Sequence, residues 1–265
     1  MKKSTLLFAL AVGALCANLT RAQVFVGSDD FNSGASAKWD YVYRLNSATD
    51  GNLTFSNNRL DFSTTAGAGN QHRLWNSDGT ASPSVTASSY TTGWTMTMSA
   101  TNLMNLGPSE FAAIGFEVYN DSNAYFALML NSNNGILTAR AEGSNFTTTS
   151  SVLGSSTDVL LRMSWDATAH TLAAAYSLDG NSYTSVATFN PSVWTNTPYP
   201  TSNGFNFDVF GNTNYASAIA VGSMYADNFS LTAVPEPSTY AAFAGLGALG
   251  LAFWRRRQVR DMAKA

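Results

Sequence analysis

The sequence predicts an all-β fold, an antiparallel two-sheet sandwich, flanked by an N-terminal signal peptide and a C-terminal transmembrane helix. Three observations predict the sandwich. Short stretches of alternating apolar and polar residues recur about every ten residues in the body, residues 23–232. Clusters of Asn, Asp, Gly and Ser separate these stretches, and such residues are typical of turns. The body contains no long amphipathic helical pattern, and its length is sufficient for one hydrophobic core.

The stretch GWTMTMSA at residues 93–100 shows the alternation. Trp94, Met96 and Met98 fall on one face of a strand, and Thr95 and Thr97 fall on the other. This pattern predicts a strand with one face in the core and one face in water.

Turn residues predict the hairpins. Strands at 112–119 and 124–130 flank the polar segment 120–123, and an Asn-Gly turn at 134–135 leads into a strand at 136–141. Asn-Gly readily adopts the positive φ angles of tight hairpins. The other predicted strands are 53–55 paired with 59–62, a meander of 159–165, 171–178 and 182–189, and closing strands at 205–210 and 223–231.

The N-terminal segment predicts export. Two lysines precede an apolar run at 6–15 and a small-x-small site at 20–22, so residues 1–22 are predicted to be a signal peptide. Lipoprotein processing at Cys16 is an alternative, but the preceding Leu15 is bulky where a small residue is needed. Cys16 is the only cysteine, so the mature domain is expected to form no disulfide.

The C-terminal segment predicts attachment to a membrane. The uncharged run 238–254 would span about 25 Å as a helix, which is close to the thickness of a bilayer core. Trp254 suits the membrane interface, and the three arginines that follow predict a cytoplasmic tail at 259–265. The alternative is a buried C-terminal helix of a soluble domain.

Pro235, Glu236 and Pro237 precede the uncharged run, and Arg255, Arg256 and Arg257 follow it. With these residues, the C-terminal segment 233–258 resembles the PEP-CTERM sorting signal of Gram-negative bacteria. The resemblance implies that an exosortase is a partner, and that the body is transferred to the cell surface or extracellular matrix.

The body resembles the concanavalin A-like jelly roll of laminin G domains and legume lectins. The resemblance rests on Asp29-Asp30-Phe31, on the strand-turn-strand segment 161–183, and on the closing segment 225–229. It implies that the first and last strands lie side by side. Asp29, Asp30 and Asp227 would then converge, which suggests a structural calcium ion as the only cofactor, since calcium prefers oxygen ligands. The alternative is that Asp29 and Asp227 cap turns.

Charge excludes one class of partner. The body contains six basic and 15 acidic residues, a net charge of −9, whereas the whole chain carries −3. Because an acidic surface repels phosphate backbones, we expect no nucleic-acid partner.

Catalytic motifs are missing from the sequence. The body has two histidines, His72 and His170, which are predicted to lie on the surface in different elements, and no G-x-S-x-G motif marks a nucleophile. The E-x-D-x-x-E motif of jelly-roll glycosidases is absent, and the pair of acids that comes closest to this motif, Glu117 and Asp121, has the wrong spacing. We therefore predict no catalytic residues and no enzymatic activity.

Aromatic side chains next to polar loops are candidates for stacking on sugars. Trp75, Trp194 and Tyr199 are the predicted glycan-binding residues, and Trp39, Tyr41 and Tyr215 are weaker candidates. The sequence thus predicts an exported, exosortase-sorted surface or matrix protein. Its non-catalytic sandwich would bind glycan or exopolysaccharide, or serve a structural role. The alternatives are a divergent jelly-roll glycoside hydrolase and a protein-binding adhesin.

Overall fold

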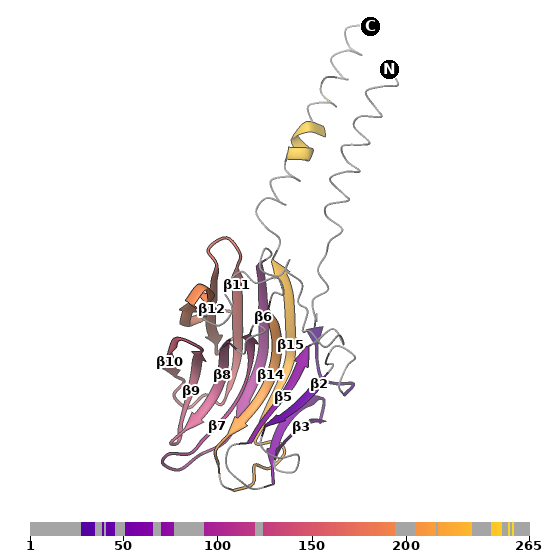
Figure 1. Cartoon of the computed structure of the whole chain (residues 1–265). Helices are drawn as coiled ribbons and strands as arrows, with labels where there is room; N and C mark the ends of the chain where they lie inside the picture. The colour runs from indigo at the N-terminus through magenta and orange to yellow at the C-terminus, as the bar shows by residue number, and fades with distance from the viewer. Residues whose placement is uncertain are drawn as a thin grey trace.

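The described residues of the computed structural model form two antiparallel β-sheets that pack face to face (Figure 1). The structure describes residues 28–34, 39, 41–45, 51–65, 70–76, 93–119, 124–193, 205–215, 217–234, 245–250, 254 and 256. The predicted all-β, two-sheet fold is therefore confirmed for this part of the chain. A short 3-10 helix, Pro191–Val193, follows the last strand of the meander.

The first sheet has eight strands. In spatial order these are β13 (Thr184–Phe189), β12 (Thr171–Ser177), β11 (Asp158–Asp166), β6 (Gly93–Asn102), β15 (Met224–Val234), β4 (Arg59–Thr64) and β3 (Gly51–Ser56), and β1 (Ser28–Asp29) pairs with β15.

The second sheet has seven strands. Their spatial order is β10 (Phe146–Val152), β9 (Ile136–Gly143), β8 (Tyr125–Asn133), β7 (Phe111–Tyr119), β14 (Asn206–Thr213), β5 (Asn70–Asn76) and β2 (Tyr41–Leu45). The predicted hairpins and the meander are all present as antiparallel pairs. The sequence did not predict β2, β5 or β10.

The first and last strands pair, as the resemblance to the jelly roll implied. Asp29 of β1 lies opposite Phe229 of β15, and Ser28 lies opposite Ser230. β15 bends at a bulge between Asp227 and Ser230, where Asn228 adopts a φ of 52°.

Large aromatic residues hold the two sheets together. Trp94, Met96 and Met98 on β6 are fully buried, which confirms the predicted inward face of this strand. The Trp94 ring contacts Phe205 and Phe207 in edge-to-face geometry, at centroid distances of 5.5 and 5.1 Å. Because Phe207 belongs to β14 in the second sheet, these contacts join the sheets through the core.

The tight turns have the backbone geometry that their residues favour. Asn134 and Gly135, between β8 and β9, have φ angles of 52° and 71°. Asn57 and Asn58, between β3 and β4, have φ angles of 51° and 59°. Positive φ at both central residues matches the twist of the flanking strands, so these dipeptides fix the register of their hairpins.

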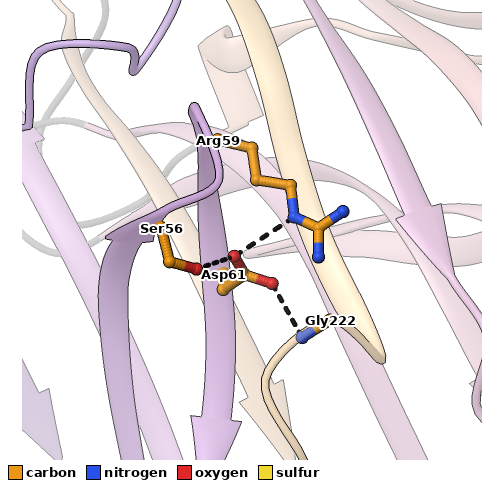
Figure 2. A network of polar contacts seen from close by, with 4 residues as sticks. All are labelled: Ser56, Arg59, Asp61 and Gly222. Atoms are coloured by element: carbon orange, nitrogen blue, oxygen red, sulfur yellow. Dashed lines mark hydrogen bonds and ion pairs between the residues drawn. The ribbon is translucent and has the colours of Figure 1, made fainter.

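A buried carboxylate fastens the β3–β4 hairpin to the turn before β15 (Figure 2). Asp61 on β4 is fully buried and accepts a hydrogen bond of 2.5 Å from the Ser56 hydroxyl and one of 2.8 Å from the Gly222 backbone N–H. Arg59 adds an ion pair of 3.2 Å and also lies 3.6 Å from the centre of the Tyr225 ring. Each oxygen of Asp61 therefore has a protein partner, which is expected of a structural carboxylate.

The predicted terminal segments lie mostly outside the described residues. The signal peptide predicted at 1–22 lies outside the described residues, and so do Pro235, Glu236 and Pro237. Residues 245–250, 254 and 256 are helical. Within the described ranges, no helix has the length and apolar character needed to cross a membrane.

Candidate functional site

Two acids lie on the outer face of the seven-stranded sheet, the face that points away from the other sheet. On β7, Phe116 and Val118 belong to the core, so Glu117 between them points outward. On β14, both neighbours of Asp208 likewise belong to the core. The two strands therefore each place one carboxylate on the outer face.

Glu117 and Asp208 are neighbours across the two strands. They are directly opposite each other in the β7–β14 register. Directly opposite residues of an antiparallel pair have Cβ atoms about 4.5–5.5 Å apart, so the two carboxyl groups can reach one another. The sequence analysis paired Glu117 with Asp121 instead, and Asp121 lies outside the described residues. A usable signal was present, since each acid interrupts an apolar strand at a position that alternation assigns to the outer face.

These two acids are the centre of a longer row that crosses six strands. We name it the acidic row. Its members are consecutive register partners, from β2 to β9: Tyr41, Trp75, Asp208, Glu117, Ala127 and Glu142. Two aromatic residues occupy one end of the row, three acids follow, and the small Ala127 separates the last two acids. The backbone register thus brings two aromatic positions into line with three acids across this sheet.

The surroundings of the row combine polar and apolar groups. Arg140 and Glu142 form an ion pair of 2.6 Å with side chains that are 31% and 24% exposed, and the Arg140 Nε atom is buried without a hydrogen-bond partner within the described structure. An apolar cluster that includes Ala127 of the row consists of Ala113, Ala127, Met129 and Phe210, and the partly buried Tyr125 packs against it.

The central pair of the row is shielded from water. Glu117 is 2% exposed and Asp208 is fully buried, although both lie on the outer face. Paired carboxylates can act as acid and nucleophile in glycoside hydrolysis when a sugar reaches them, and the same groups can accept hydrogen bonds from sugar hydroxyls.

The structure describes only some of the aromatic residues that were predicted to bind glycan. The backbone of Trp75 lies in β5, opposite Asp208, so this residue joins the acidic row. Trp194 and Tyr199 lie outside the described residues. Trp39 is 6% exposed and its Nε1–H donates a hydrogen bond of 2.6 Å to Asp29, so it belongs to the core. Tyr215 is half-buried and packs against the core.

The acids predicted to bind calcium have protein partners. Asp29 accepts hydrogen bonds from the Phe31 backbone N–H and from Trp39, and Asp227 accepts one from the Asn228 backbone N–H. The bond from Phe31 to Asp29 is that of a carboxylate that caps a turn, whereas Asp227 and Asn228 both lie within β15. Burial, with a smaller contribution from the charge of Asp30, raises the pKa of Asp227.

No metal centre is preformed in the described part of the chain. Among its residues, no group of three or more His, Cys, Asp or Glu side chains is placed to hold a metal ion. The residues Asp29, Asp30 and Asp227 thus do not form a ready-made calcium site, and calcium binding stays a prediction. His170 is exposed and its ring stacks on Trp165 at a centroid distance of 6.1 Å, whereas His72 is placed only by its backbone in β5.

Comparison with known families identifies the C-terminal segment. Residues 233–257 match the PEP-CTERM protein-sorting motif, which confirms the prediction made from this segment. The chain therefore carries a sorting motif that overlaps the end of β15. No curated protein matches the chain.

Comparison with solved structures supports the β-sandwich. GH43B of a Bacteroides ovatus xyloglucan PUL has a TM-score of 0.53 at 12% identity, over 78% of this chain and 39% of that one. This chain thus spans about two fifths of the length of that protein. A functionally unknown protein from Saccharomyces cerevisiae has a TM-score of 0.50 at 13% identity, over 76% of this chain and all of that one. Lectin I-B4 from Griffonia simplicifolia has a TM-score of 0.46 at 12% identity, over 78% of this chain and 99% of that one.

Proposed function

We propose that this protein is exported, held in the membrane by its C-terminal segment, and sorted to the cell surface or extracellular matrix by an exosortase. The observation that carries the proposal is the sorting motif at residues 233–257, which overlaps the last two residues of the last strand of the sandwich. The predicted signal peptide and the run of 17 uncharged residues at 238–254 support the same route.

Sorting is tested in the native host by cell fractionation and intact mass. We expect the wild-type protein in the surface or matrix fraction, with an intact mass that corresponds to a C-terminus between Pro235 and Ser238. Pro235→Ala together with Pro237→Ala should leave a full-length chain in the inner membrane. Pro108→Ala is the matched control, because Pro108 is exposed and lies outside the motif. Normal sorting of the double variant would contradict the proposal.

We further propose that the sandwich binds glycan or exopolysaccharide without hydrolysing it, through the acidic row. Supporting this are the position of Trp75 beside Asp208, the partly exposed Arg140–Glu142 pair, and the row's direction across the strands. The mature protein released from the cell surface should bind glycans on an array or the host's own exopolysaccharide, and Trp75→Ala should weaken that binding.

A glycoside hydrolase is the second candidate, because Glu117 and Asp208 face each other across β7 and β14. Their Cβ spacing of about 4.5–5.5 Å is compatible with the separation of about 5–5.5 Å between the carboxyl groups of retaining glycosidases. Release of reducing sugars from a polysaccharide panel, abolished by Glu117→Gln and by Asp208→Asn, would favour this candidate. Binding to cells whose glycans have been stripped would instead favour a protein-binding adhesin.

A further inference from the structure

The sorting motif begins inside the folded sandwich. The matched segment starts at residue 233, and Ala233 and Val234 are paired with Trp94 and Gly93 in the β15–β6 ladder. The next residue, Pro235, has no backbone N–H and cannot continue the ladder. Strand and motif therefore meet without a linker between them.

The end of β15 is firmly held. Its last four residues, Leu231–Val234, are in register with β6, and Leu231 is 2% exposed in the core. Releasing these residues would break the hydrogen bonds of the ladder and expose the buried Leu231 side chain to water, and both changes are unfavourable. We therefore expect the motif to be presented while the sandwich is folded.

Only three residues, 235–237, separate Val234 from the predicted membrane segment at 238–254. Fully extended, they reach at most about 11 Å. The headgroup region on one side of a bilayer is about 5–8 Å thick. This reach places the end of β15 at the level of the headgroups or just above them.

We propose that, in the membrane-held precursor, the sandwich stands directly on the membrane surface at the end where β15 finishes, which we name the tail-side end. This inference rests on the membrane attachment proposed above. The tail-side end includes the β11–β12 turn at 166–170, because Trp165 lies opposite Trp94 and Asp166 lies opposite Thr171. The opposite end includes Gly154 and Ser155, just before β11.

The same geometry fixes the place of the acidic row. The Asn102 side chain donates a hydrogen bond to the Ala112 backbone, and Asn102 lies opposite Met224 at the far end of β15. β7 therefore begins at the far end and finishes with Tyr119 at the tail-side end. Glu117 is two residues from that finish, about 7 Å along the strand. Because the row crosses the strands, a bound polysaccharide would lie parallel to the membrane and close to it.

The test measures the height of two exposed positions above the membrane. Thr168 lies in the tail-side turn and Ser155 lies at the opposite end, and β11 between them spans about 26 Å. The full chain is made in a host without an exosortase, with Cys16→Ser and either Thr168→Cys or Ser155→Cys. Each protein is labelled with a fluorophore. It is then reconstituted in vesicles of phosphatidylethanolamine and phosphatidylglycerol that carry nitroxide headgroups.

We expect the Thr168→Cys probe to be quenched several-fold more strongly than the Ser155→Cys probe. A Gly/Ser insert of about ten residues after Val234, with a reach of roughly 17 Å, should reduce this difference. Protein that fails to float with the vesicles would overturn the membrane attachment itself. Protein that floats but shows equal quenching of the two probes, or no response to the insert, would overturn the close seating alone.

Discussion

Gly211→Ala tests how closely the two sheets approach each other. Gly211 on β14 lies under the Phe62 ring of β4, which is fully buried. A Cβ atom at position 211 would lie 2.2 Å from Cδ2 and 2.3 Å from Cγ of that ring. Ordinary carbon contacts are about 3.5–4.0 Å, so the ring or the strand would have to move by about 1.3 Å or more.

Displacement of this size in a packed core costs about 1–3 kcal/mol. For a domain of this size we expect the melting temperature of Gly211→Ala to fall by about 2–12 °C. Gly107→Ala is the matched control. Its Cβ would approach only the flexible end of the Glu110 side chain, at 3.0 Å, so its melting temperature should change much less. Thermal unfolding followed by circular dichroism measures both.

A double-mutant cycle identifies the cause. Phe62→Leu is destabilising in itself, but it removes the ring atoms that the new Cβ would meet. Gly211→Ala should therefore cost less in the Phe62→Leu background than in the wild type, with a coupling of about 0.5–3 kcal/mol. Strictly additive changes, or a Gly211→Ala protein as stable as the Gly107→Ala control, would refute the assigned contact.

Three further predictions concern single carboxylates. Asp61→Asn should lower the free energy of unfolding by about 1.5–3 kcal/mol, since an amide nitrogen cannot accept the bonds from Ser56 and Arg59; urea unfolding measures it. Backbone hydrogen bonds, first among them the one from Ser182, lower the pKa of Asp179 from 3.8 to about 2, so its stabilisation is complete above pH 3.8 and is lost as the pH falls towards 2. Asp179→Asn should flatten melting temperature against pH in that window, and an unchanged slope would disprove the assignment. Burial raises the pKa of Asp227, so as the pH falls the folded state takes up the proton of this group before the unfolded state does. The ionised carboxylate is therefore destabilising at neutral pH, and Asp227→Asn should raise the melting temperature at pH 7, with a gain that disappears in acid. Stabilisation of the wild type by added calcium would reverse this order.

Local chemistry predicted most of the sandwich. The Asn-Gly turn at 134–135 and the asparagines at 57–58 have the positive φ angles that their side chains tolerate, so the hairpins on either side could be placed from the sequence. The alternation of apolar and polar residues around Trp94 also comes from neighbouring residues, so the core face of that strand could be predicted as well. Of the three strands that escaped prediction, β5 and β10 read NQHRLWN and FTTTSSV, and such polar strings satisfy no apolar alternation. The third, β2, is the short segment YVYRL.

The candidate site could not be predicted in the same way. Glu117 and Asp208 meet because β14 pairs with β7, and the register of two strands so distant in sequence is set by the whole core and not by local residues. Asp61 shows the same limit, since its partner Gly222 lies in a distant turn. The sequence could have shown each acid inside an apolar strand, but not which acid it would face.

The stability of the acidic row distinguishes a structural pair from a functional one. Two buried carboxylates at directly opposite positions repel each other when both are ionised, and burial adds a desolvation cost. If their partners in the protein balance that cost, Glu117→Gln and Asp208→Asn should destabilise the fold. If the acids contact a ligand, each substitution should also weaken glycan binding. Our proposal predicts this loss of binding. Lower stability of both variants with unchanged binding would make the pair a structural feature, and the binding surface would then have to be sought elsewhere.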